Sequence, residues 1–181
     1  MSDFDSNDFS ADNPRVRPDR QVYKYLRNRV GGLVDMNIDG SITPQIFEYV
    51  VPAGYDFYAF RLNLGALANG IDPDGFLGLA ELTNGLDIQL RNAADAVILD
   101  YLDGEHFTHH HDFGYLAGVD SDIRPNASGP DGFGVRWTMA KNGAPDYLEQ
   151  GQKFVMIIND NLSTIVEMRA MLQGVLVKRS I

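Results

Sequence analysis

The chain contains no cysteine, which excludes disulfide bonds, thiolate-bound zinc and a cysteine nucleophile. It has no run of about 18 consecutive apolar residues, so the sequence predicts no membrane-spanning helix. The first ten residues are acidic and contain no apolar core, so we expect no secretory signal. With 181 residues, of which 44% are hydrophobic, the chain is long enough to bury a core as one domain without covalent cross-links.

Positive charge is also scarce, because 15 Lys and Arg stand against 25 Asp and Glu, for a formal net charge of −10. Such a surface disfavours nucleic acid as a partner. The cations gather in residues 14–29, where six of them stand against one acid, directly after the acidic residues 1–13. We interpret residues 1–29 as an extended N-terminal arm with one short helical turn near residues 22–26, and residues 30–181 as the folded domain.

The basic stretch of the arm has two interpretations. It is either a solvated charged tail or a segment that docks on an acidic neighbour, such as a second copy of this chain. Ordering a segment costs about 1–2 kcal/mol per residue, so a docking arm must bury apolar side chains as well. The candidate partner-binding residues are therefore both aromatic and basic: Phe4, Phe9, Arg15, Arg17, Arg20, Tyr23, Lys24, Tyr25, Arg27 and Arg29.

Apolar and polar residues alternate through most of the folded domain, which predicts β-strands separated by glycine- and proline-containing turns. The predicted strands cover residues 34–38, 46–51, 55–64, 86–91, 96–102, 135–139, 152–159 and 164–178. One short helix is expected at residues 76–83. The last two strands are expected to form a closing pair joined by a polar turn. Strands at this spacing predict an all-β fold, an antiparallel two-sheet sandwich, with a jelly roll as the favoured topology.

All four histidines lie within residues 106–111, where His109 and His111 would point to one side of an extended strand. They are weak candidates for a metal site, because a cupin-type or two-histidine-one-carboxylate centre needs a further histidine from a distant strand. A site shared between subunits is the remaining metal hypothesis. We expect no cofactor, and we interpret these histidines as exposed or interface residues.

No motif for nucleophilic catalysis or phosphate binding is present, since the sequence has neither a Gly-x-Ser-x-Gly elbow nor a glycine-rich loop that opens a helix. The acidic loops at residues 72–75 and 120–122 lack the ligand spacing of an EF-hand and are typical of turns. The sequence therefore predicts no catalytic residue and a non-enzymatic protein. Phe76 and Phe133, in or beside loops, are candidate sugar-stacking residues, which keeps a glycan-binding module open.

Six short stretches of strand and turn residues follow one another along the chain: Gly40–Pro44, Tyr49–Gly54, Gly78–Gly85, Leu116–Asp120, Val135–Thr138 and Asp160–Ser163. Together they resemble a group of small β-sandwich structural proteins of tailed-phage virions and prophages. The resemblance covers residues 40–180 and leaves the arm outside. It implies a virion component of the capsid surface, neck or tail, and it carries over no catalytic residue. The histidine cluster departs from the pattern of the group.

Residues and resemblance together predict a capsid decoration or head–tail protein that assembles through its N-terminal arm. The expected location is the virion, and the expected partners are other virion proteins and further copies of this chain, with a trimer favoured. Neither a membrane nor nucleic acid is expected as a partner. The alternatives are a glycan- or receptor-binding tail module, which would bind through loops 66–76 and 120–134, and a metal-dependent jelly-roll enzyme.

Overall fold

The computed structural model describes residues 21–29, 38–68, 82–102, 104, 131–139, 144–163 and 165–179. These residues contain ten β-strands and no helix. The strands are β1 (Gln21–Tyr25), β2 (Arg27–Asn28), β3 (Gln45–Val50), β4 (Tyr55–Ala68), β5 (Leu86–Arg91), β6 (Val97–Asp100), β7 (Asp131–Thr138), β8 (Asp146–Leu148), β9 (Lys153–Ile158) and β10 (Ile165–Lys178).

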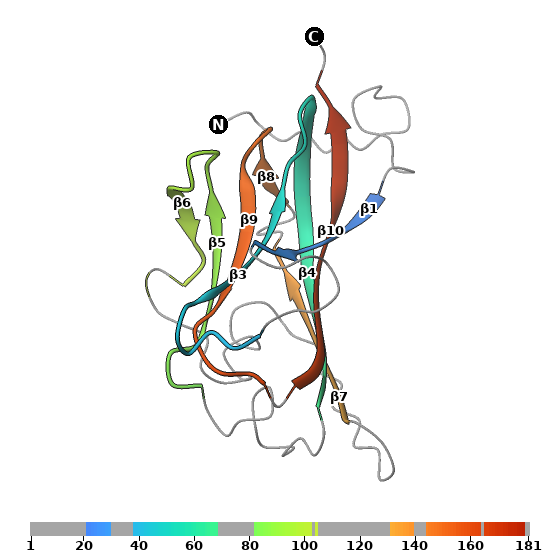
Figure 1. Cartoon of the computed structure of the whole chain (residues 1–181). Coiled ribbons are helices and arrows are strands. Elements are labelled where there is room, and N and C mark those ends of the chain that lie inside the picture. The colour runs from blue at the N-terminus through green and yellow to red at the C-terminus, as the bar shows by residue number, and fades with distance from the viewer. Residues whose placement is uncertain are drawn as a thin grey trace.

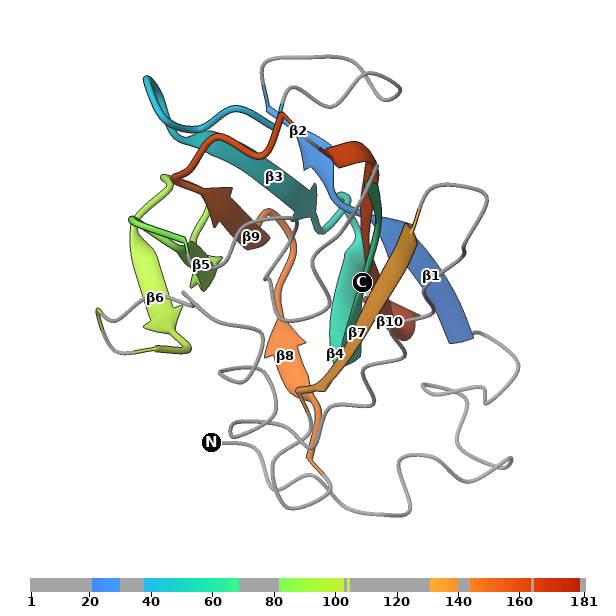
Figure 2. The same cartoon turned by 90° about the horizontal axis from the view of Figure 1, so that it is seen from below.

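The strands form two antiparallel sheets that pack face to face (Figure 1; Figure 2). Sheet A has the order β1-β10-β4-β7, and β8 also pairs with β4. Sheet B has the order β2-β3-β9-β5-β6. The predicted all-β, two-sheet sandwich is thus confirmed, whereas the jelly-roll topology stays a prediction.

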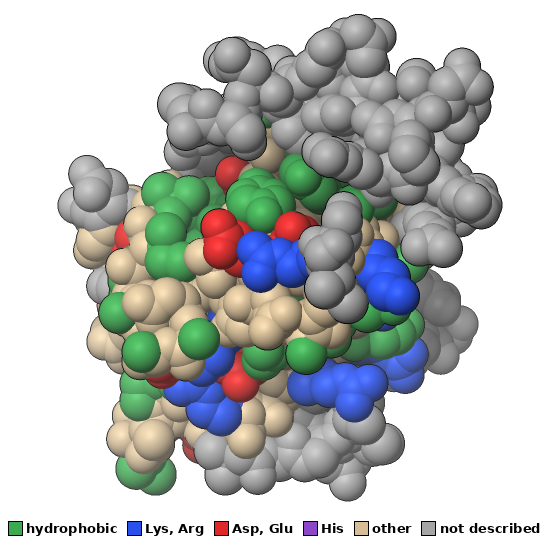
Figure 3. All heavy atoms as spheres, turned by 90° about the horizontal axis from the view of Figure 1, so that it is seen from above, with side chains coloured by type: hydrophobic (Ala, Val, Ile, Leu, Met, Phe, Trp, Pro, Cys, Tyr) green, Lys and Arg blue, Asp and Glu red, His purple; other side chains and the backbone are tan. Residues whose placement is uncertain are grey.

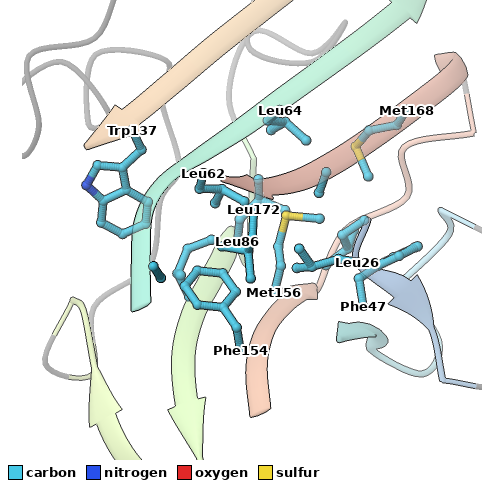
Figure 4. Close-up of a cluster of buried hydrophobic side chains, with 14 of the residues drawn as sticks. Leu26, Phe47, Leu62, Leu64, Leu86, Trp137, Phe154, Met156, Met168 and Leu172 are labelled. Carbon is cyan, nitrogen blue, oxygen red and sulfur yellow. The ribbon is translucent and has the colours of Figure 1, made fainter. Parts of the chain in front are cut away.

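One hydrophobic core fills the space between the sheets. Figure 4 shows Leu62 and Leu172 of sheet A directed toward Phe154 and Met156 of sheet B. Phe47, Phe154 and Met156 are fully buried. Burying a side chain of this size stabilises the fold by about 1.5–3 kcal/mol, so the alternating apolar positions of the facing strands account for the cohesion of the sandwich.

The segment that we assigned to the arm contributes a strand to each sheet within its described part. β1 pairs with β10, and β2 pairs with β3. Between them Leu26 is buried, and its N–H donates to the carbonyl of Ala170 at 2.9 Å. The helical turn expected near residues 22–26 is wrong. Val22 and the two tyrosines of β1 favour extended backbone, and pairing with β10 satisfies its polar groups.

The last two strands, β9 and β10, do not pair with each other. β9 lies between β3 and β5 in sheet B, and β10 lies between β1 and β4 in sheet A. The expected closing pair is therefore wrong, and the polar connection crosses from one sheet to the other. The physical reason is that β9 has buried apolar side chains on both sides, Phe154 toward the core and Val155 and Ile157 opposite it, which suits a strand flanked by β3 and β5.

Five of the other predicted strands are present as β3, β4, β5, β6 and β7, with ends that differ by a few residues. β8, a three-residue strand, was not predicted. Of the strand predicted at residues 34–38, only Ile38 is described, and it is buried. Of the helix predicted at residues 76–83, only Leu82 and Thr83 are described, and they lie outside any helix or strand.

Candidate binding surfaces

The outer face of sheet A carries two rows of side chains that cross four strands. Residues paired across antiparallel strands point to the same side, so the register defines each row. The first row contains Tyr23, Gln173, Arg61 and Thr138, from β1, β10, β4 and β7. The second contains Tyr25, Met171, Asn63 and Arg136, from the same strands. The core residues Leu62, Leu64 and Leu172 alternate with these positions, which places both rows on the outer face.

Large side chains in these rows reach solvent. Tyr23 is 55% exposed and Tyr25 is 49% exposed, and Arg61 and Arg136 are exposed beside them. The amide of Asn63 donates to the carbonyl of Met171 at 3.5 Å, which orients it within the row. We call the six residues that present a ring, an amide or a guanidinium the Tyr–Arg face: Tyr23, Tyr25, Arg61, Asn63, Arg136 and Gln173.

The charge of this surface is opposite to that of the chain as a whole. Neither row contains Asp or Glu, and exposed Arg169 lies on the same face beside the second row. Figure 3, a view from above, shows Lys and Arg side chains at the right, on the side where Figure 1 places sheet A. On a chain of net charge −10, such a surface attracts anionic groups selectively.

The outer face of sheet B carries a cluster of ion pairs centred on Asp95, which we call the Asp95 cluster. Arg29 donates to both carboxylate oxygens of Asp95, at 2.9 and 2.8 Å, and to Glu48 at 2.6 Å. Lys153 and Arg91 reach Asp95 at 3.1 and 3.2 Å. Hydrogen bonds from Arg29, with further ones from Lys153, hold the pKa of the Asp95 carboxyl well below its usual range.

The charged groups of the Asp95 cluster pair with one another, and these pairs join several parts of the fold. It connects the residue after β2 with β3, β9, β5 and the β5–β6 turn. Val155, which pairs with Glu48 on this face, is fully buried. The cluster therefore acts as a clamp across sheet B.

A half-buried tyrosine links the two sheets near the sole tryptophan. The hydroxyl of Tyr101, after β6, donates to the carboxylate of Asp146 on β8. Its ring packs edge-on against Trp137, with ring centres 5.1 Å apart. Burial, together with the charge of Asp146, raises the pKa of Tyr101 far above that of a free phenol, so this hydroxyl stays protonated as a structural donor.

Strand β6 exposes three consecutive aliphatic side chains at the edge of sheet B. Val97 is 51% exposed, Ile98 is 50% exposed and Leu99 is 39% exposed. The register shifts between Leu90 and Arg91, which leaves one additional residue in β6 and forms a bulge. Both ribbon views place β6 at the outer edge of sheet B, away from the strands of sheet A (Figure 1; Figure 2). We call Val97, Ile98 and Leu99 the β6 patch.

The structure places only some of the residues that the sequence singled out. Tyr23, Lys24 and Tyr25 lie on β1, Arg27 is exposed on β2, and Arg29 belongs to the Asp95 cluster. Phe133 lies on β7, where it pairs with Ala66. The remaining candidates lie outside the described residues: Phe4, Phe9, Arg15, Arg17, Arg20, Phe76, His109 and His111.

Sequence reasoning did not select four residues of the Tyr–Arg face, namely Arg61, Asn63, Arg136 and Gln173. Their signal was present, because each occupies a polar position in an alternating strand. What the alternation does not reveal is that β4, β7 and β10 are neighbours, which is what gathers these residues into two rows.

Comparison of the chain with protein-family models, with curated proteins and with solved structures finds no match. Within the described part of the chain, no group of three or more His, Asp or Glu is arranged to hold a metal ion. The described residues include no helix long and apolar enough to cross a membrane.

Proposed function

We propose that the protein is a non-enzymatic structural protein of a tailed-phage virion, acting as a capsid decoration or as a neck or tail component. The observation that carries this proposal is the β6 patch. Three adjacent aliphatic side chains at the edge of a sheet, each between 39% and 51% exposed, are typical of a surface that is covered by a neighbouring protein. The resemblance of the strand and turn sequences to small virion sandwiches supplies the class of assembly.

In this proposal the neighbouring protein contacts the side chains of β6 and does not add a strand to the edge of sheet B. β6 has only four residues and contains a bulge, and short, bulged edges resist pairing with a further strand. A neighbouring virion protein would therefore cover Val97, Ile98 and Leu99 with apolar side chains of its own.

The N-terminal arm contributes a second contact in this proposal. Among the described strands β1 lies at the edge of sheet A, and Gln21 is its first residue. The basic and aromatic residues of this segment supply charge for orienting the subunit and rings for burial against a neighbour. A jelly-roll topology and a trimeric homo-oligomer belong to the same proposal.

Fractionation of virions followed by quantitative mass spectrometry tests the proposal. We expect the chain to co-purify with particles, at a high copy number if it decorates the capsid and at a low one if it belongs to the neck or tail. Ile98→Lys should reduce incorporation, whereas Val50→Lys should not, because Val50 is a similarly exposed aliphatic residue (43%) away from β6. Absence from particles, or equal incorporation of both variants, would contradict it.

The Tyr–Arg face favours a second candidate function, glycan binding by a receptor-binding tail module. Two exposed tyrosines on neighbouring outward positions of one strand form an aromatic surface on which sugar rings can stack. This surface lies on sheet A and not on the loops at residues 66–76 and 120–134 that the sequence suggested.

A further inference from the structure

We infer that the Tyr–Arg face binds a polysaccharide that carries carboxylate groups at intervals, such as a uronate-containing or sialylated glycan. This inference rests on the second candidate function and is independent of the contact proposed for β6. It names the chemical class of the ligand from the side chains that the sheet register brings together.

The rings supply the surface for stacking. Tyr23 and Tyr25 stand two residues apart on β1, a separation of roughly 6.6–6.8 Å along the strand. Each tyrosine is about half exposed, so part of the residue packs against the sheet while apolar surface stays open to a sugar. Between the rings and the arginines lie the half-buried amides of Gln173 and Asn63, groups that donate to and accept from sugar hydroxyls.

The guanidinium groups supply the charge selectivity. Arg61 and Arg136 are exposed on the adjacent strands β4 and β7, on the same side as the rings. A guanidinium binds a carboxylate through two parallel hydrogen bonds, a geometry that neutral sugars cannot use. The chain as a whole has a net charge of −10, so an anionic ligand is favoured at a surface that presents arginines and disfavoured at the acidic surfaces.

The same observations disfavour nucleic acid and protein as the ligand. Duplex nucleic acid carries one charge per roughly 1.7 Å, and a chain of net charge −10 repels so dense a polyanion. A protein partner would require an apolar centre, but Met171 is the only aliphatic residue in the two rows. A polymer with sparse carboxylates and many hydroxyls fits two arginines, two amides and two phenol rings.

The test begins with binding of the full chain to hyaluronan and polygalacturonate oligosaccharides and to sialyllactose. Dextran, a neutral glycan, and single-stranded oligothymidylate serve as comparison ligands. We expect at least one carboxylated glycan to bind, dextran to bind at least about tenfold more weakly, and the affinity to fall as salt rises. Binding that is strongest for oligothymidylate, or equal for dextran, would overturn the inference, as would no binding by any of the three carboxylated probes.

Variants then locate the site. Arg61→Gln and Arg136→Gln should each weaken the affinity about tenfold, which corresponds to the loss of a charged hydrogen bond. The double variant Tyr23→Ala/Tyr25→Ala should abolish measurable binding. Arg27→Gln removes the same charge from an exposed position on sheet B and should leave the affinity unchanged. Equal affinities for Arg27→Gln and the two face variants would overturn the assignment.

The β6 variant separates failure of this inference from failure of the proposed virion role. Ile98→Lys should retain glycan binding while it reduces incorporation into particles. Circular dichroism checks that every variant is folded. If Arg61→Gln does not fold, Arg61→Lys replaces it, because lysine keeps the charge but loses the two-pronged geometry.

Discussion

Arg29 and Asp95, 66 residues apart, form a two-pronged ion pair with N–O distances of 2.9 and 2.8 Å. Asp95 has a φ of 70°, in the left-handed region that Asp and Asn tolerate better than most residues. The β5–β6 turn thus presents its carboxylate toward the cation that follows β2. This pair attaches the segment that follows β2 to the β5–β6 turn of sheet B.

The first prediction concerns the charge of Asp95. Asp95→Asn keeps a residue suited to the turn but removes the carboxylate. We therefore expect the free energy of unfolding to fall by about 1–2 kcal/mol at neutral pH. The folded pKa of Asp95 lies below the unfolded value of about 3.9. The stabilisation from the Asp95 carboxylate is therefore fully present above about pH 3.9, and it is lost as the pH falls below that value.

Urea unfolding, followed through the fluorescence of buried Trp137, measures this effect. The difference in stability between the wild-type protein and Asp95→Asn should narrow as the pH falls below about 3.9. A difference that stays constant from neutral to acid pH would show that the carboxylate charge is not its cause.

Substitution of Asp160 should cause a larger loss of stability. Its buried carboxylate accepts hydrogen bonds from the backbone N–H groups of Thr83, Asn84 and Gly85, at 3.1, 2.9 and 2.7 Å. Asp160→Ala leaves these donors without their acceptor, so we expect the free energy of unfolding to fall by about 3 kcal/mol. Asp160→Asn keeps one acceptor oxygen and should lose less. Equal denaturation midpoints for the two variants would contradict this account.

Two glycines in long strands form a matched pair. A Cβ at Gly174 of β10 would clash with the carbonyl oxygen of Tyr58 and the ring of Phe57, whereas a Cβ at Gly65 of β4 would meet nothing within 4 Å. We expect Gly174→Ala to lower stability by about 2–3 kcal/mol and Gly65→Ala to be tolerated. Thermal unfolding of both variants checks this, and equal melting temperatures would refute it.

Alkaline pH should weaken the fold through two partly buried tyrosines. Burial raises the pKa of Tyr49 to about 12 and that of Tyr101 much further. In the unfolded chain these phenols ionise near pH 10, so the folded state holds more protons above that value and stability falls as the pH rises.

Tyr101→Phe isolates the contribution of one phenol. Loss of the hydrogen bond to Asp146 should cost about 1–2 kcal/mol at neutral pH. Above about pH 10 the difference from the wild-type protein should narrow, because only the wild-type residue can ionise on unfolding. Urea midpoints at neutral pH and above pH 10 measure both values, and a difference that widens would contradict the proposed linkage.

Truncation tests where the folded body begins. Deletion of residues 1–20 should leave the described sandwich intact, since β1 and β2 are retained. Deletion of residues 1–29 removes both strands and Arg29, so we expect a markedly lower urea midpoint. If both truncated proteins are equally stable, β1, β2 and the Arg29 ion pairs contribute little to the fold.

The sequence by itself determined the fold class and most of the strands, because the alternation of apolar and polar residues is a local property with a period of two. Met168, Ala170 and Leu172 are buried and Arg169 is exposed, as their alternation indicates. The same rule failed for Asp87 and Gln89, which are buried at polar positions of β5. Alternation predicts the side of a strand, but it does not show what covers that side.

Only the tertiary structure decided which strands are neighbours. β9 and β10 are consecutive in the chain but belong to different sheets, and β1 pairs with the last strand. Strand pairing joins backbone groups that are identical in every residue, so its specificity comes from how all the buried faces fit together and not from any short segment. The same long-range fit places Tyr23 and Arg61 in one row, on either side of Gln173, and brings Arg29 to Asp95. No local pattern contains that information.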